Sequence, residues 1–163
     1  MGCESVEVSE LRPEEQAAVR SLILAGLAEH WGAVDSALNR DLDDLVATYA
    51  KGTILVARDE GRVVGTGTIV RRDDRCAEIV RMSVASEYRR TGLGRRLVQD
   101  LLAAGRSWGV ERVVLETSAH WIEVVDFYLR CGFTLTHFED GVFGRDAWFE
   151  MKLTLGVQSL PGR

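Results

Sequence analysis

The stretch AEIVRMSVASEYRRTGLG, residues 77–94, changes its pattern midway. The first half is hydrophobic and predicts a strand over 76–84, the third strand of an antiparallel meander that begins at Thr53. The second half contains the turn Arg-Arg-Thr-Gly-Leu-Gly at 89–94. Leucines at 93, 97 and 101 then predict a long amphipathic helix. The stretch is therefore a strand, a tight turn and a helix in direct succession.

This turn has the chemistry of a phosphate site. Glycines at 92 and 94 permit a tight turn and let backbone N–H groups approach an anion. The helix that follows adds unpaired amides and the positive end of its dipole. Arginines at 89, 90, 95 and 96 increase the local positive potential. Glycine at such a junction can also serve turn geometry alone, so the turn by itself leaves both interpretations open.

Two common phosphate motifs do not fit the turn. A Walker loop needs Gly-Lys-Ser/Thr at the start of the helix, and no lysine lies near it. A Rossmann turn needs a third glycine, but Leu97 occupies that position. The preceding strands are also predicted to form a hairpin meander, which a Rossmann fold does not place there.

Residues 77–94 closely resemble the central motif of GNAT acetyltransferases, a hydrophobic strand followed by Arg/Gln-x-x-Gly-x-Gly/Ala and a helix. A second family element follows at the expected distance, because FYLRCGF at 127–133 matches Tyr-x-x-x-Gly-Phe. With the order of elements, the resemblance covers about residues 5–155. It implies the α/β (α+β) fold of GNAT acyl-CoA N-acyltransferases, a mixed, mostly antiparallel sheet flanked by helices.

Length and composition agree with one such domain. The chain has 163 residues, of which 46% are hydrophobic and 28% charged, as in globular proteins. We predict a single domain over 1–155 and a C-terminal tail over 156–163. The other expected elements are listed here in chain order: a strand at Val6 and Val8, a helix from Pro13, a short helix capped by Asn39 or Asp41, a strand over 112–117, a helix over 121–131, and a hairpin of 133–138 with 147–155.

Charge and cysteine content bear on the compartment of the protein and on its possible ligands. The formal net charge of −5 argues against a nucleic-acid-binding surface. Three widely spaced cysteines without a nearby histidine cluster predict reduced thiols and no metal site. No run approaches the ~18 apolar residues of a membrane span, and no signal peptide is expected. We therefore predict a cytoplasmic protein that binds neither nucleic acid nor membranes.

The resemblance implies acetyl-CoA as co-substrate and no metal. In GNAT enzymes the amides of the turn hold the CoA pyrophosphate, and the pantetheine arm pairs with the strand before it. Backbone N–H groups of that strand, often at a bulge, can also polarise the thioester carbonyl. The corresponding positions here are Arg89, Arg90, Thr91, Gly92, Leu93, Gly94 and Arg95 in the turn, and Met82, Ser83 and Val84 in the strand.

Proton transfer needs a base, because an amine with a pKa of about 10.4 must lose a proton before it attacks. The resemblance makes Glu78 the candidate base, acting directly or through a water chain. On a regular strand Glu78 shares the face of Met82 and Val84, which meets the cofactor. A surface ion pair with Arg81 or Arg75 is the alternative role for Glu78.

Tyr128 is the candidate acid for the leaving thiolate, because the family places a tyrosine here. The alternative is an aromatic core residue. The chain departs from the family at Trp121, where an asparagine often contacts the cofactor. His120 beside it is either a substitute base or a surface histidine. Cys131 lacks the partners of a nucleophile.

The implied reaction is direct transfer of an acetyl group from acetyl-CoA to a primary amine in a ternary complex. A small-molecule amine is the first expectation. A protein N-terminus or lysine is one alternative, and a non-catalytic acyl-CoA-binding sensor module is another. Acceptor choice in the family comes from the first two helices and the last hairpin, which are acidic here. In that hairpin Phe143 and Trp148 either line an acceptor pocket or close the sheet. Similar proteins are often homodimers, and no sequence feature decides this.

Overall fold

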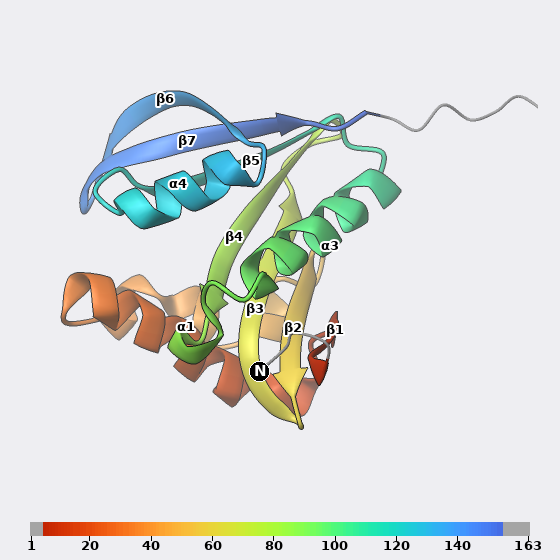
Figure 1. The fold of residues 1–163 in the computed structure, drawn as a ribbon, viewed down its shortest axis with the longest axis vertical. Coiled ribbons are helices and arrows are strands. Elements are labelled where there is room, and N and C mark those ends of the chain that lie inside the picture. Colours follow the sequence, from red (N-terminus) through yellow and green to blue (C-terminus); the bar gives the residue numbers. More distant parts are fainter. Residues whose placement is uncertain (1–4, 155–163) are drawn as a thin grey trace, which may run out of the picture.

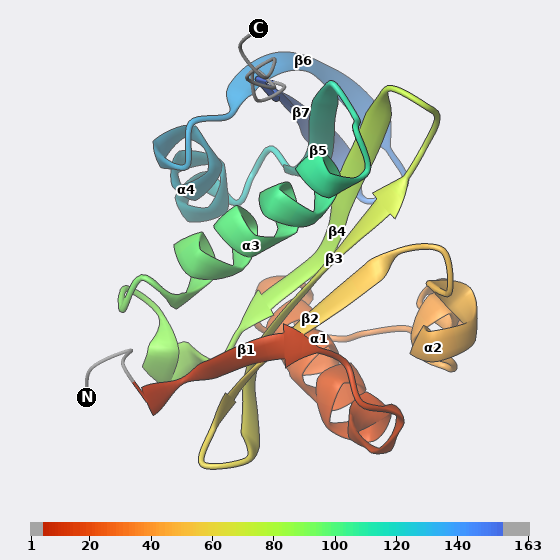
Figure 2. The same ribbon diagram turned by 90° about the vertical axis from the view of Figure 1, so that its right-hand side faces the viewer.

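The computed structural model describes residues 5–154, which build one seven-stranded sheet with helices on both faces (Figures 1 and 2). The strand order is β1-β2-β3-β4-β5-β7-β6, and only the β4–β5 pair is parallel. This confirms the mixed, mostly antiparallel sheet flanked by helices. The predicted tail, 156–163, lies outside the described residues. Within 5–154, no helix is long and apolar enough to cross a membrane.

The elements follow the predicted order. The strands are β1 (Glu7–Glu10), β2 (Thr53–Asp59), β3 (Arg62–Arg71), β4 (Cys76–Val84), β5 (Arg112–Ser118), β6 (Thr134–Gly141) and β7 (Gly144–Lys152). The α-helices are α1 (Gln16–Trp31), α2 (Leu45–Thr48), α3 (Leu93–Ser107) and α4 (Ile122–Arg130).

The short second helix begins later than predicted. Two 3-10 turns, Ser36–Leu38 and Arg40–Leu42, precede α2. Asp44 caps α2, because its carboxylate accepts a hydrogen bond from the Ala47 amide at 3.0 Å. Neither Asn39 nor Asp41, the predicted caps, holds that position. Asp41 serves a different contact, described with the site below.

Two hydrophobic cores lie on the two faces of the sheet. Helices α3 and α4 cover one face, where Leu93, Leu97 and Leu101 are fully buried against β3 and β4 (Figure 2). Helices α1 and α2 cover the other face of β2–β4, where Val19 and Leu45 are buried. Each such side chain contributes roughly 1.5–3 kcal/mol when it leaves water. Within residues 5–154, no helix covers the opposite face of β5, β7 and β6 (Figure 2).

The connection from α2 to β2 packs tightly on β3 at Gly52. A Cβ atom at Gly52 would lie 2.5 Å from the Ile69 carbonyl oxygen, which belongs to the β3 backbone. Because backbone cannot rotate away, we expect Gly52→Ala to lower the free energy of unfolding by about 1–3 kcal/mol. Urea denaturation measures this change.

Gly26→Ala is the matched control. A Cβ there would meet only the Ser83 hydroxyl, at 2.9 Å, and that hydroxyl can rotate. The substitution also increases helix propensity within α1. A cost for Gly52→Ala no larger than that for Gly26→Ala would contradict the tight packing at β3.

Candidate active site

Strands β4 and β5 separate after a short parallel contact. Their register pairs are Cys76–Arg112, Ala77–Val113 and Glu78–Val114. Both strands continue beyond this contact, β4 to Val84 and β5 to Ser118, and they diverge (Figure 1). In the part of the chain that the structure describes, the edge of β4 that faces β5 therefore has no strand partner beyond Glu78. We call this region, between 79–84 of β4 and 115–118 of β5, the split.

A β-bulge lies in β4 beside the split. Ser83 pairs with Thr66 and Val80 with Thr68, so Arg81 and Met82 together face Gly67. Arg81 has φ 54°, in the left-handed region. One extra residue reverses the alternation of side chains along the strand. The bulge therefore lies beside Met82, Ser83 and Val84, the strand positions predicted to contact the cofactor.

The bulge corrects the predicted face of Glu78. Met82 and Val84 point to the α3 side, where they pack with the larger core. Glu78 and Val80 lie on the opposite side, and so does Ser83, whose hydroxyl donates to the Leu22 carbonyl of α1. Glu78 therefore does not share a face with Met82 and Val84, because the strand is not regular between them.

Among the described residues, the glycine turn leaves three backbone amides at the start of α3 without an acceptor. Gly92 has φ 89° and precedes the first residue of the helix, Leu93. The first helical amide with a backbone acceptor is that of Arg96, which donates to the Gly92 carbonyl. The amides of Leu93, Gly94 and Arg95 are thus left for an outside acceptor. Such a donor set, with the helix dipole behind it, suits a pyrophosphate.

Residues of the turn pack closely against α4, α1 and the end of β4. A Cβ at Gly94 would lie 3.2 Å from the Phe127 ring of α4, so glycine lets α3 and α4 approach across the split. The Arg89 guanidinium forms an ion pair with Glu29 of α1 at 2.7 Å and donates to the Val84 carbonyl at 3.2 Å. Arg89 therefore connects the turn to α1 and to the end of β4.

Tyr128 lies inside the core on the α3–α4 side. Its ring contacts Phe127, Phe133 and Phe149, with centroids 5.0, 5.9 and 6.0 Å apart. Burial, with a smaller contribution from Cys131, raises the pKa of the Tyr128 phenol, so the hydroxyl stays protonated at neutral pH. Burial likewise raises the pKa of the Cys131 thiol, which disfavours a thiolate there. Tyr128 is therefore a potential proton donor.

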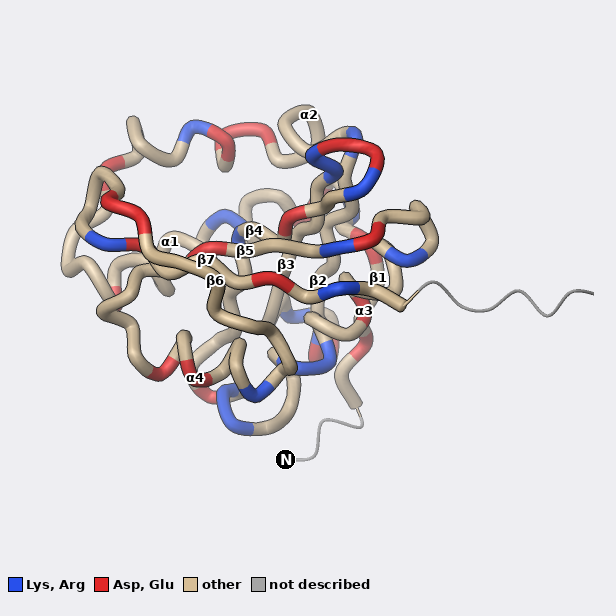
Figure 3. The backbone as a smooth tube through the Cα atoms, turned by 90° about the horizontal axis from the view of Figure 1, so that it is seen from above, with Lys and Arg blue, Asp and Glu red and all other residues tan. Residues whose placement is uncertain are grey.

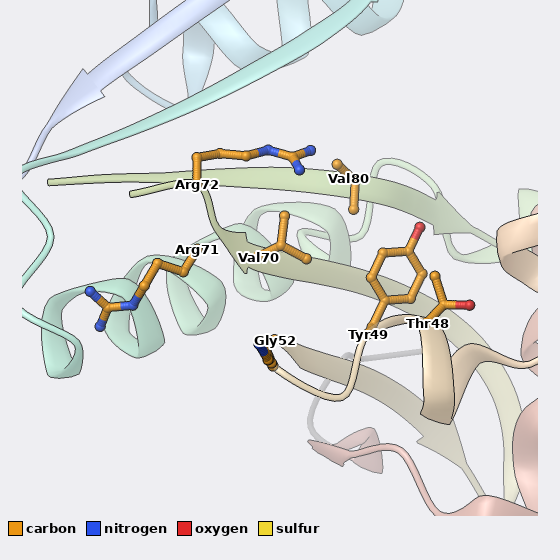
Figure 4. A pocket seen from close by; sticks show the side chains of 8 residues that line it. Thr48, Tyr49, Gly52, Val70, Arg71, Arg72 and Val80 are labelled. Carbon is orange, nitrogen blue, oxygen red and sulfur yellow. The ribbon is translucent and has the colours of Figure 1, made fainter. Parts of the chain in front are cut away.

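Glu78 is nearly buried on the other side of the sheet. Its carboxylate accepts a hydrogen bond from Arg72 Nε at 2.5 Å, so its partner is neither Arg81 nor Arg75. Figure 4 shows Arg72 extending along a pocket toward Val80, while Arg71 points away. The pocket has a volume of about 390 Å³. It is lined by Thr48, Tyr49, Lys51, Gly52, Val70, Arg71, Arg72 and Val80. This pocket brings solvent close to the Glu78–Arg72 pair.

Arg81 connects the bulge by hydrogen bonds to the segment between α1 and α2. It makes two hydrogen bonds to the Asp41 carboxylate, at 2.6 and 2.8 Å, and one to Asn39 Oδ1. The Tyr49 hydroxyl also donates to Asp41, at 2.6 Å. Burial and the bond to Asp41 raise the pKa of Tyr49 to about 12. The sequence carried no signal for this network, since its members lie up to 42 residues apart.

Burial alone raises the pKa of Asp41, but the hydrogen bonds from Arg81 and Tyr49 outweigh it and leave that pKa below its usual value. Elsewhere around the sheet, acidic and basic positions are interspersed (Figure 3).

Glu116 of β5 is an exception, because several acidic residues lie near it. Burial raises its pKa, and the nearby charges of Asp146, Glu78 and Glu139 raise it further.

Comparison with known proteins agrees with this arrangement. Residues 17–133 match the sequence model of the Acetyltransferase (GNAT) family. The chain belongs to the GNAT family. It is 33% identical over 88 residues to an uncharacterised N-acetyltransferase of Mycobacterium tuberculosis, covering 54% of this chain. The match covers 56% of that relative, so the chain spans only about half of the relative's length.

Solved structures show the same fold. An acetyltransferase from Streptococcus agalactiae matches with a TM-score of 0.80 at 23% identity, over 92% of this chain and 99% of that one. An N-acetyltransferase from Thermoplasma acidophilum, solved in complex with coenzyme A, matches with a TM-score of 0.76 at 16% identity. That match covers 91% of this chain and 99% of the other. The expected GNAT fold is thereby confirmed.

The Asp41 network predicts a pH-dependent contribution to stability. We expect Asp41→Asn to lower the free energy of unfolding by about 1–3 kcal/mol at pH 7, because Arg81 loses its charged partner. The folded-state pKa of Asp41 lies below its unfolded value of about 3.9. The contribution is therefore complete well above pH 4 and is lost as the pH falls through the folded pKa.

Urea denaturation of both proteins at pH 7, 5 and 3 measures this difference. The gap between wild type and Asp41→Asn should stay constant from pH 7 to 5 and narrow toward pH 3. A gap that does not narrow in acid would show that the Asp41 charge does not stabilise the folded state.

Proposed function

We propose that this protein transfers an acetyl group from acetyl-CoA to a primary amine, with a small molecule as the acceptor. The observation that carries the proposal is the split: an unpaired strand edge with a bulge, directly followed by a turn with three free amides. An extended, phosphate-bearing cofactor needs both a strand to pair with and an anion site at its end. The CoA complex of the Thermoplasma relative supports the same cofactor class.

The cofactor side of the site comprises the split and the turn. The amides of 93–95, together with Arg90 and Arg95, would hold the pyrophosphate. The backbone of Met82, Ser83 and Val84 would pair with the pantetheine arm and orient the thioester carbonyl. When bound, acetyl-CoA supplies an acetyl group activated as a thioester. The side chain of Arg89 acts mainly on the protein itself, through Glu29 and Val84.

Proton transfer is divided between the two faces of the sheet. On the α1–α2 face, Glu78 takes a proton from the acceptor ammonium, directly or through water from the neighbouring pocket. The neutral nitrogen then forms a bond to the acetyl carbon as the carbon–sulfur bond breaks. On the α3–α4 face, the protonated Tyr128 hydroxyl donates a proton to the leaving thiolate. The acetylated nitrogen loses its second proton to solvent, and solvent returns a proton to Tyr128. This division suits a substrate that enters from the face opposite the CoA phosphates.

A thiol-release assay with acetyl-CoA tests the proposal. The acceptor panel contains amines, polyamines, amino acids, aminoglycosides and peptides, and calorimetry measures CoA binding separately. Amine-dependent release supports the transferase. Release with peptides alone would instead indicate a protein acceptor. CoA binding without release would favour a sensor module, and absence of CoA binding would refute the proposed function.

Tyr128→Phe tests the acid. We expect kcat to fall about 10²-fold or more, because general acid catalysis contributes ~10²–10⁴-fold. The CoA dissociation constant and the melting temperature should change little, since the substitution removes only the hydroxyl. Unchanged kcat would leave Tyr128 as a core aromatic residue.

Glu78→Gln tests the base. We expect kcat/KM to fall by ~10²-fold and its pH profile to change, because a glutamine amide cannot accept the proton of the acceptor ammonium. Glu150→Gln is the matched control, since Glu150 is a carboxylate of β7 that pairs with Arg112. A pH profile that is the same in Glu78→Gln and wild type would exclude Glu78 as the base.

A further inference from the structure

Three aromatic side chains from distant parts of the sequence meet at the open end of the split. Trp31 ends α1, Trp121 precedes α4, and Phe143 lies in the β6–β7 turn. The ring centroids of Trp31 and Trp121 are 5.2 Å apart, and those of Trp31 and Phe143 are 5.5 Å apart. His30 stacks on Trp121 at 4.2 Å. We call Trp31, Trp121 and Phe143 the aromatic cluster.

The cluster bridges the two halves of the sheet. The end of α1 belongs to the β1–β4 half, whereas α4 and the β6–β7 turn belong to the β5–β7 half, and all three lie on the same side in Figure 1. The cluster is also joined to the candidate cofactor turn, because Glu29, two residues before Trp31, pairs with Arg89 at 2.7 Å. It therefore lies where an acceptor would approach the split.

Much of this apolar surface is open to solvent. Trp31 is 40% exposed and Phe143 is 57% exposed, although each contacts another aromatic ring. Aromatic rings that stay this exposed have not gained all of the free energy available from burial. A ligand with an apolar group would cover the remaining surface.

Two carboxylates, Glu116 and Asp146, make the strand surface next to the aromatic cluster negatively charged. Asp146 of β7 pairs in register with Ser118 of β5, three residues before Trp121, and Glu116 lies two residues earlier on β5. Among residues 5–154, neither Glu116 nor Asp146 has an ion-pair partner. Burial is the largest cause of the raised pKa of Glu116, and the neighbouring charges of Asp146 and Glu139 raise it further, while Arg72 lowers it. A positively charged amine complements the negative charge of these carboxylates, and a phosphorylated amine does not.

We infer that the acceptor is a cationic primary amine bearing an aryl or alkyl group, which packs on Trp31 and Phe143 while its ammonium group lies near Glu116 and Asp146. The inference rests on the proposed function and names the substrate class for the same site. It also assigns Trp31 and Phe143 as specificity-determining residues. Neither residue touches the reacting atoms in this assignment.

Three probes of related structure test the inference: phenethylamine, ethylamine and O-phosphoethanolamine. We expect kcat/KM to be at least about tenfold higher for phenethylamine than for ethylamine, because the phenyl ring adds apolar contact. O-Phosphoethanolamine should be the poorest acceptor, because its phosphate meets the carboxylates. Equal kcat/KM for all three, or the highest value for O-phosphoethanolamine, would overturn the inference.

Two substitutions test whether Trp31 and Phe143 cause the preference for phenethylamine over ethylamine. Phe143→Ala and Trp31→Ala should each reduce the ratio of kcat/KM for phenethylamine to that for ethylamine at least about fivefold, with CoA affinity unchanged, because the phenyl ring loses more apolar contact than the ethyl group. Ile122→Ala is the matched control, because Ile122 is 76% exposed on α4 and contributes no ring to the cluster. An equal loss in Ile122→Ala, or no loss in the two cluster variants, would overturn the inference.

Calorimetry with phenethylamine separates this inference from the proposed function. Binding of phenethylamine by wild type that is weakened in Phe143→Ala supports the site even if no acetyl group is transferred. Absence of CoA binding would refute the proposed function alone. Tight CoA binding and transfer to other amines, with no binding of phenethylamine, would refute only the substrate class.

Discussion

The separation of β4 from β5 after three residue pairs is the constraint on which the rest of the site depends. A parallel pair that continued to Val84 would satisfy the backbone of β4 and leave no edge for a ligand. The bulge at Arg81 and Met82 occurs where the strands have already parted, so its irregular backbone lies at an unpaired edge. The turn and α3 follow directly. Strand edge, bulge and helix start therefore lie within one continuous segment of chain.

This segment also separates the two faces of the sheet chemically. The α3–α4 side is apolar around Tyr128, and burial there keeps the phenol protonated. The α1–α2 side holds Glu78 with Arg72 and the Arg81–Asp41–Tyr49 network. A base needs access to solvent and acceptor, whereas an acid for a thiolate benefits from a site without water. The bulge creates this difference, since it sends Glu78 and Met82 to opposite faces.

The features that the sequence predicted well are local ones. The strand, turn and helix of 77–94 follow from hydrophobic periodicity and glycine spacing, and the structure has β4 and α3 there. The face of Glu78 could not be predicted, because the left-handed residue of the bulge is Arg81 and no glycine marks it. The Asp41–Arg81 contact and the aromatic cluster join residues that only the topology brings together. Phe143 was an open candidate because the resemblance places acceptor choice in the last hairpin, and its partner Trp31 belongs to the other half of the fold.

The split also bears on how the molecule holds together. The β5–β7–β6 half of the sheet is joined to the other half by a short parallel ladder, by helix packing and by the aromatic cluster. A strand-like ligand in the split would add hydrogen bonds along the edge of β4 and contacts to α4, and so join the halves along most of their length. A ligand that binds only the folded state stabilises that state by about 2.7 kcal/mol at a concentration of 100 Kd. The cofactor would then act as a removable structural element, and the cohesion of the fold would depend on its concentration.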